Sequence, residues 1–152
     1  FRLSNAVGAP THPEIDRWML LVNDLCRQAV LDKRMVLHSS GGQRRDFIAF
    51  SDVERALALV LGLPAGAWGA GPYNLGGSHS LTVIDVAVMV AARCRVVLGF
   101  EPLIERPAAA PGEIDRPFDY RIDKFRALGF NPSGDLNAEI DDTLRLCREA
   151  FS

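Results

Sequence analysis

The sequence predicts an α/β fold made of a few parallel strands and a small mixed lobe. Short apolar segments with strand character alternate with longer segments whose apolar residues recur at helical spacing. Roughly three strand segments suit a parallel sheet, whereas a complete doubly wound domain needs about five or six. The 152 residues are enough for one domain. Because the chain opens at Phe1 on an apolar segment, we expect it to be part of something longer.

Composition and charge exclude several classes of protein. Hydrophobic residues make up 48% of the chain and charged residues 24%, as in an ordinary globular domain and unlike a disordered one. The formal net charge of -2 gives no reason to expect a nucleic-acid partner or an anionic membrane surface. No apolar run approaches the ~20 residues that span a bilayer, and no secretory signal is visible. We therefore expect a cytoplasmic protein with no membrane partner.

The three cysteines, Cys26, Cys94 and Cys147, indicate neither a disulfide framework nor a zinc site. They are widely spaced and odd in number, and no CxxC or CxxH pair occurs. We expect them to be small core residues of a protein from a reducing compartment.

The first part of the chain is expected to hold a long helix between short strands. Residues 1–4 have strand character. Pro13 and the acid that follows it indicate a helix running to about residue 31, with Ile15 and Met19 in its apolar stripe. Asn23 falls on the polar side of this helix. The next strand candidates are residues 35–37 and 46–50.

The later elements follow from caps and glycines. Residues 51–54 (Ser-Asp-Val-Glu) predict a capping box, ahead of a helix whose apolar stripe includes Leu57 and Leu61. Ser80 or Thr82 starts the following helix. The remaining expected elements are a strand at 73–75, a strand at 103–105, the longest loop at 106–117, an extended segment at 118–122, a helix at 123–128 closed by Gly129, and a helix at 135–150.

The sequence contains no complete active site of its own. It has no GxGxxG or GxxxxGK[ST] loop for phosphates, no HExxH and no GxSxG. The three histidines lie on different loops, so we expect no catalytic residue and no metal ligand. The most informative segment is "GGQRRDFIAFSDV", where Arg45 stands at the start of an apolar strand. A guanidinium fixed there could hold a diphosphate, and a solvated arginine pair that ends a turn is the alternative.

Four segments resemble, in order and spacing, the C-terminal half of the extended short-chain dehydrogenases, the NAD-dependent sugar-nucleotide epimerases and dehydratases. "RLSNAVGAP" resembles the family's R-x-x-N-x-[YF]-G-P turn, and "GGQRRDFIAFSDVERAL" resembles G-x-x-x-R-D-F-I-x-V-x-D-V-x-x-A. "YNLGGSHSLTVIDVAVMVA" is similar to the segment that begins Y-N-[IL]-G, and "PGEIDRPFDYRIDKFRALGFNP" to the late loop with K-x-x-x-x-L-G-[FW]-x-P. The resemblance covers nearly the whole chain. It implies a Rossmann-like fold whose cofactor-binding half is absent.

The resemblance also implies a set of substrate contacts. Asn5 would contact the sugar nucleotide, with a turn-forming role as the alternative, and Arg45 would bind the nucleotide diphosphate. In the late loop, Asp115 would contact ribose and Arg116 would contact phosphate. Asn23 lies in the region that approaches the base.

Cofactor contacts are implied only at the first strand. Leu3 or Ser4 would touch the nicotinamide edge of an NAD, or NADP, that the absent half holds together with the family's Tyr-x-x-x-Lys pair. Tyr120 and Lys124 have that spacing, but they stand at a strand-to-helix joint, so we expect them not to be catalytic. Val7 replaces the aromatic residue usual in the family's turn, which leaves the sugar undetermined.

The chain is therefore predicted to be the substrate-binding half of an NAD-dependent sugar-nucleotide epimerase or dehydratase, inactive by itself. It would hold a nucleotide-diphosphate sugar and position the sugar for hydride transfer to the cofactor. The alternative is a non-catalytic nucleotide-binding or interaction module that kept the fold without the chemistry. Because part of its core would face the absent half, we expect the isolated chain to self-associate.

Overall fold

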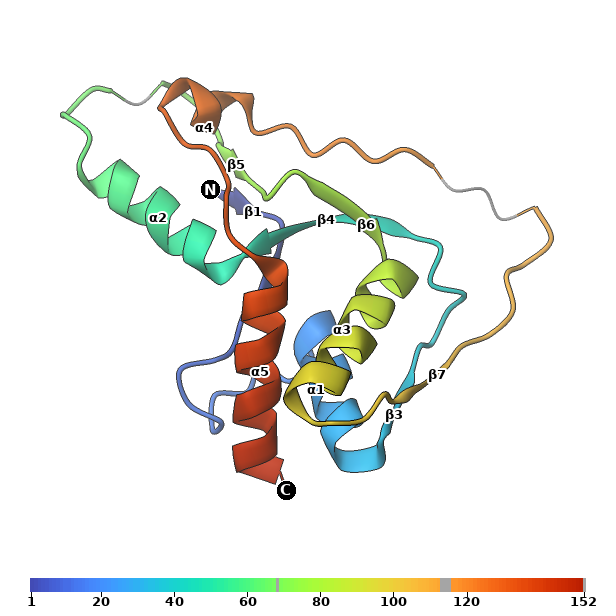
Figure 1. The fold of residues 1–152 in the computed structure, drawn as a ribbon. Coiled ribbons are helices and arrows are strands. Elements are labelled where there is room, and N and C mark those ends of the chain that lie inside the picture. The colour runs from blue at the N-terminus through green and yellow to red at the C-terminus, as the bar shows by residue number, and fades with distance from the viewer. Residues whose placement is uncertain (68, 113–115, 152) are drawn as a thin grey trace.

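The computed structural model describes residues 1–67, 69–112 and 116–151, and it confirms the α/β class (Figure 1). The described strands form three small sheets, and each sheet contains one parallel pair: β1 with β5, β2 with β4, and β3 with β7. Strand β6 adds to β4 in the antiparallel sense. The strands are β1 (Arg2–Leu3), β2 (Asn5–Val7), β3 (Arg34–Val36), β4 (Arg44–Ala49), β5 (Asn74–Leu75), β6 (His79–Thr82) and β7 (Leu103–Glu105).

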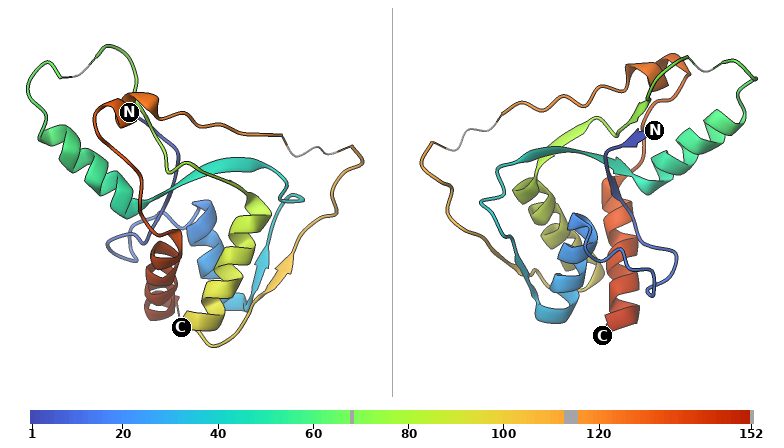
Figure 2. Two further views of the ribbon diagram at one scale, coloured as in Figure 1. Left: turned by 45° about the horizontal axis from the view of Figure 1, so that its top comes forward. Right: turned by 180° about the vertical axis from the view of Figure 1, so that it is seen from behind.

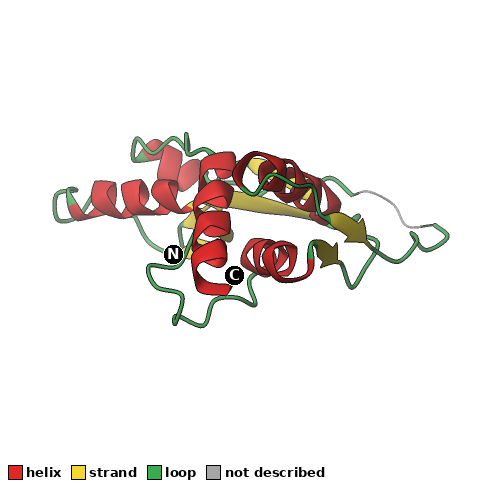
Figure 3. Ribbon diagram, turned by 60° about the horizontal axis from the view of Figure 1, so that its bottom comes forward, coloured by secondary structure: helices red, strands yellow, loops and turns green. Residues whose placement is uncertain are grey.

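Strand β4 lies at the centre of the largest sheet and divides two hydrophobic cores. Its side chains alternate between the two faces of the sheet. Phe47 belongs to the larger core, and the next residue, Ile48, belongs to the smaller one. Asn5 of β2 lies opposite Phe47 in the parallel register. In Figure 3 the strands lie at the middle of the molecule, with helices on both sides of them.

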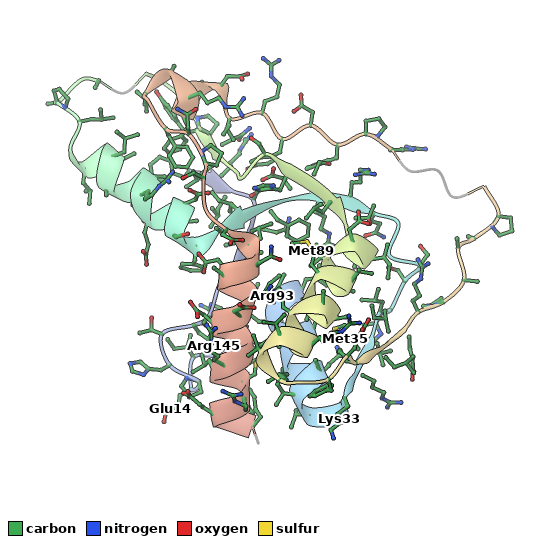
Figure 4. All side chains as sticks on the ribbon, in the orientation of Figure 1. Glu14, Lys33, Met35, Met89, Arg93 and Arg145 are labelled. Carbon is green, nitrogen blue, oxygen red and sulfur yellow. The ribbon has the colours of Figure 1, made fainter. Side chains whose placement is uncertain are left out.

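The larger core is built from three helices that pack against one another on the Phe47 side of β4. Helix α3 is tied to α5 by Arg93, which is labelled in Figure 4 and donates two hydrogen bonds of 2.6 Å to the carboxylate oxygens of Asp141. Such a paired, charge-assisted contact fixes the relative position of the two helices. The three helices are α1 (Leu21–Asp32), α3 (Val83–Val97) and α5 (Leu136–Phe151).

The smaller core lies beneath α2 (Phe50–Leu61) and α4 (Asp123–Ala127). Phe125 of α4 is fully buried there beside Ile48. The far end of α2 projects from the body of the molecule (Figure 2). Leu57 and Leu61, which the periodicity placed in an inward stripe, are 42% and 86% exposed. The amphipathic pattern of α2 is therefore only partly satisfied within the described residues.

The predicted helix from Pro13 was wrong in its first two turns, because α1 begins only at Leu21. Residues 11–20 form turns around Trp18, whose ring is buried and packs edge-on against Phe151 at 5.0 Å between centroids. The Trp18 Nε1–H donates to the Pro13 main-chain oxygen at 2.9 Å. A tertiary anchor thus replaces local helix formation here. Ile15 and Met19, assigned to the apolar stripe, are 39% and 87% exposed.

The capping box predicted at residues 51–54 was also wrong. Helix α2 begins at Phe50 after an extended Ala49, and it has no side-chain cap. Instead, the Asp52 carboxylate accepts hydrogen bonds from the main-chain N–H groups of Ser133 and Gly134, which lead into α5. A capping box does form at α3, where Thr82 and Asp85 bond reciprocally, so Thr82 and not Ser80 caps that helix.

The other expected elements are mostly confirmed, with shifts at their ends. The strand expected at residues 1–4 forms only as β1, and β2 and β6 lie where no strand was expected. Residues 118–122 form no strand. Gly129, at φ +92°, follows the short α4 as expected. Among the described helices, none has both the length and the apolar character to cross a membrane.

Candidate functional site

A pocket of about 480 Å³ lies between the first two strands and the start of α1. It brings together Leu3, Ser4, Asn5 and Asn23, which are four of the residues predicted from the sequence to contact substrate or cofactor. They come from elements separated by a long loop, so only the folded chain makes them neighbours. Most of the remaining lining is apolar or small. A mostly apolar pocket with a few polar groups is the usual form of a small-molecule site.

Asn5 is held at the floor of this pocket by the sheet itself. Its Nδ2 donates a hydrogen bond of 2.9 Å to the main-chain oxygen of Asp46, the neighbour of its register partner Phe47. An amide nitrogen carries two protons and an amide oxygen accepts bonds, so this contact leaves further hydrogen-bonding capacity for a ligand. The alternative, that Asn5 forms a turn, is not what the structure shows: its side chain bonds across to the neighbouring strand.

Arg45 lies in β4, two residues before Phe47, which lines the pocket. Residues two apart share a face of a strand and lie about 7 Å apart along it. Arg45 is exposed, and its side chain makes no hydrogen bond or ion pair within the described residues. It therefore offers an unpaired guanidinium on the face of β4 that carries the pocket. The neighbouring Arg44 is on the other face and donates to the Ser80 main-chain oxygen at 3.0 Å.

Asn23 lies in the wall of the pocket, and its prediction as a residue on the polar side of a helix was wrong. Its side chain is 2% exposed. The Nδ2 donates to the main-chain oxygen of Arg17 at 3.3 Å. The reason for the difference is the late start of α1, which puts Asn23 in its first turn against the preceding loop. Asn23 thus holds that loop in place.

Arg116 is not part of the pocket. It lines a separate hollow of about 680 Å³ together with Arg44, Gly42 and Phe118. Arg45 is not among the described residues that line this hollow. Asp115 lies outside the described residues.

Asp46 of β4 lies close to Ser4, which lines the pocket. Burial raises the pKa of the Asp46 carboxyl, and donors at Gly77 and His79 oppose that shift. Its Oδ1 accepts the Gly77 N–H at 2.9 Å. The Ser4 hydroxyl lies near enough to Asp46 to lower the same pKa, yet its buried oxygen has no partner at hydrogen-bond geometry among the described groups. Asp46 is therefore held by groups of its own chain, and the buried Ser4 hydroxyl lies close to its carboxyl.

Tyr120 and Lys124 make separate main-chain contacts. The Tyr120 hydroxyl donates to the Arg2 main-chain oxygen at 2.7 Å. The Lys124 ammonium donates to the Ala70 oxygen at 2.9 Å and lies over the Tyr73 ring. Burial raises the Tyr120 pKa, with the Asp46 charge adding to the shift. These contacts pin a loop to β1 and a second loop to α4, and they give Tyr120 no feature of an activated proton donor.

The cysteines are buried and free, as expected from their spacing. Burial raises the pKa of Cys94 and of Cys147 to about 12. Burial also raises the pKa of Cys26. Among the described residues, no group of three or more His, Cys, Asp or Glu side chains is placed to hold a metal ion. The thiols therefore belong to the core between α1, α3 and α5.

Two further kinds of residue line the pocket that sequence reasoning missed. Phe47 and Phe50 supply its aromatic surface, and Arg17 is its one charged side chain among the described lining residues. The "RDFIAF" segment contains these aromatic residues, but it does not show which side of the sheet they face. The place of Arg17 in the pocket could not be predicted, because the expected helix put it among polar residues on a solvated face.

Solved structures share the overall fold of this chain. UDP-glucuronic acid 4-epimerase from Bacillus cereus, in complex with UDP-glucuronic acid and NAD, is 19% identical with a TM-score of 0.72, over 99% of this chain and 45% of that one. RMD from Pseudomonas aeruginosa, complexed with NADPH, is 15% identical with a TM-score of 0.73, over 97% and 47%. An NAD-dependent NDP-hexosamine 5,6-dehydratase of tunicamycin biosynthesis is 25% identical with a TM-score of 0.66, over 95% and 43%.

The chain thus has the fold of the C-terminal half of the extended short-chain dehydrogenases, as the sequence resemblance implied. Its solved neighbours within that class are NAD-dependent sugar-nucleotide epimerases and dehydratases. The chain spans about 45% of the length of the first of these structures. No protein-family model matches it, and no curated protein matches it in sequence.

Proposed function

We propose that this chain is the substrate-binding half of an NAD-dependent sugar-nucleotide epimerase or dehydratase. One observation carries the proposal: Leu3, Ser4, Asn5 and Asn23 line a single pocket, and Arg45 is on the same strand face as its Phe47 wall. The neighbours in complex with UDP-glucuronic acid and NAD add support. The ligand of the pocket is a nucleotide-diphosphate sugar.

The chain contributes binding and orientation to the reaction. Arg45 supplies a planar fork that pairs with diphosphate oxygens. Asn5 is fixed by Asp46 and offers its remaining donor and acceptor to the sugar nucleotide. Holding the sugar in one orientation converts a bimolecular encounter into an intramolecular step. No residue of this chain is assigned a proton transfer.

The cofactor is NAD or NADP, held mainly outside this chain, because the sequence has no glycine-rich dinucleotide loop. When bound, the nicotinamide accepts a hydride from the sugar and returns it. Leu3, 48% exposed, and Ser4 both line the pocket, and this position fits a contact with the edge of such a ring. Neighbours that carry NAD or NADPH are consistent with either cofactor.

Calorimetric titration of the full-length protein with UDP-, GDP- and dTDP-sugars tests the proposal. We expect micromolar-to-millimolar binding to one nucleotide, weakened at least tenfold by Arg45→Ala, since a charge-assisted pair is lost. Arg95→Ala is the matched control, because Arg95 is exposed at the far end of α3 and pairs with Glu101. Binding that is indifferent to Arg45→Ala, or absent from folded protein, contradicts the proposal. Binding without turnover would favour a non-catalytic nucleotide-binding module.

A further inference from the structure

Arg17 gives the pocket a charge that the proposed function does not require. Among the described residues that line the pocket, it is the one with a charged side chain. The others are apolar, small, or neutral polar groups such as Ser4, Asn5 and Asn23. A single cation in an otherwise neutral lining favours a ligand that carries an anionic group, because opposite charges attract.

The main chain at Arg17 is fixed by several hydrogen bonds. Its N–H donates to the Ile15 oxygen at 2.8 Å, and its oxygen accepts the Leu20 N–H at 3.2 Å. The same oxygen accepts the Asn23 side-chain amide at 3.3 Å. Trp18, the next residue, is buried. The loop therefore presents Arg17 from a held position rather than from a freely moving segment.

The guanidinium of Arg17 has most of its donors free. It makes one hydrogen bond, from Nη1 to the Asp16 main-chain oxygen at 2.7 Å. Within the described residues it forms no ion pair with a carboxylate, and the side chain is exposed. A guanidinium carries five N–H donors in a planar fork that matches a carboxylate with two parallel bonds. Among the described residues, Arg17 therefore has no acidic partner, and the other residues that line the pocket are neutral.

The start of α1 adds to the positive potential on this side of the pocket. Leu20, Leu21 and Val22 line the pocket, the helix has no side-chain cap, and the Asp24 carboxylate of its first turn is paired with Arg27. The first N–H groups of a helix carry a partial positive charge. The partial charge of the helix start adds to the charge of Arg17, and by itself it would not define a site.

We propose that Arg17 is a specificity-determining residue that binds a carboxylate on the sugar, so that the substrate is a nucleotide-linked uronic acid. The inference rests on the proposed function, because it names the chemical group that the sugar carries in the proposed nucleotide-sugar pocket. Arg45 holds the diphosphate, which leaves Arg17 for a second negative group. If Arg17 instead bound the diphosphate, it would strengthen the binding of acidic and neutral nucleotide sugars alike. Comparing the two affinities separates these cases.

The experiment compares each uronic acid with its neutral sugar on the same nucleotide, for example UDP-glucuronic acid with UDP-glucose. Both are titrated by calorimetry into the full-length protein. We expect the wild type to bind the uronic acid about tenfold or more tightly. Arg17→Gln should bring the ratio of the two dissociation constants to about one. Arg17→Lys, which keeps the charge but loses the fork, should retain part of the preference. Arg95→Gln, an equal change of charge at a distance, should keep it whole.

Three results would overturn the inference. The first is equal binding of the acidic and neutral sugars by the wild type. The second is a preference that survives in Arg17→Gln, and the third is a loss of affinity for both sugars with the ratio unchanged. A folded wild type that binds neither sugar on any of the three nucleotides would overturn the proposed function as well, which separates that failure from the first three.

Discussion

The Asn5 side chain and the Asp46 main chain are joined by a hydrogen bond of 2.9 Å across the parallel pair of β2 and β4. The bond ties the strand that begins the pocket to the strand that carries Arg45. The same contact thus positions two of the residues proposed to bind substrate and joins two strands of the sheet. This arrangement predicts that changes at Asn5 alter stability and binding together.

Asn5→Ala is expected to lower the free energy of unfolding by about 1 kcal/mol, the usual net value of a partly buried hydrogen bond. Affinity for the nucleotide sugar should fall about tenfold as well, since the ligand loses a polar contact. Urea unfolding and calorimetry measure the two effects. Asn137→Ala, at an exposed position of α5, is the control. Wild-type stability and affinity in Asn5→Ala would contradict the assignment.

Gly77 is expected to tolerate no side chain. A Cβ there would lie 2.0 Å from the Phe47 main-chain oxygen and 2.9 Å from the Ile48 Cα, so β4 itself would have to move. Gly77→Ala should cost about 3 kcal/mol or prevent folding. At Gly62 the nearest atom is 3.5 Å from the added Cβ and φ is -84°, so Gly62→Ala should change stability by less than about 1 kcal/mol. Comparable thermal unfolding of the two variants would refute the close approach.

The buried thiols predict a loss of stability in alkali. Burial raises the pKa of Cys94 and Cys147 from the ordinary 9.0 to about 12. The folded chain therefore keeps these protons while the unfolded chain releases them, so the stabilisation is complete below pH 9 and is lost as pH rises toward 12. Each thiol accounts for at most about 1.4 kcal/mol per pH unit. In urea unfolding from pH 8 to 10.5, wild type should lose stability more steeply than the Cys94→Ala, Cys147→Ala double variant. Parallel curves would show that the thiols are not buried.

The exposed apolar residues of β1 and α2 predict self-association of the isolated chain. Leu3 is 48% exposed and Leu61 is 86% exposed. Large apolar side chains left in water favour association. We expect light scattering to show oligomers at high concentration and Leu61→Glu to reduce their mass. Val96→Glu adds the same charge at an exposed apolar position on α3 and serves as control. A monomeric wild type would contradict the expectation.

Local patterns in the sequence were sufficient for most elements. Strand β7 was predicted at its observed bounds, and α5 within one residue at each end, because residue spacing and capping signals act over a few positions. The start of α1 could not be predicted in this way. Trp18 draws residues 11–20 into turns through contacts with Phe151, which lies at the other end of the chain.

The sequence by itself determined the α/β class, the order of most elements, the buried state of the cysteines and the family whose fold the chain has. The tertiary structure alone decided that Asn23 is buried, that Arg17 lines the pocket, and that Arg116 lines a different hollow from Asn5. The physical reason is distance along the chain. Hydrophobic periodicity reports which side of an element is apolar, whereas the pocket is made where β2, β4 and the loop before α1 meet through long-range contacts.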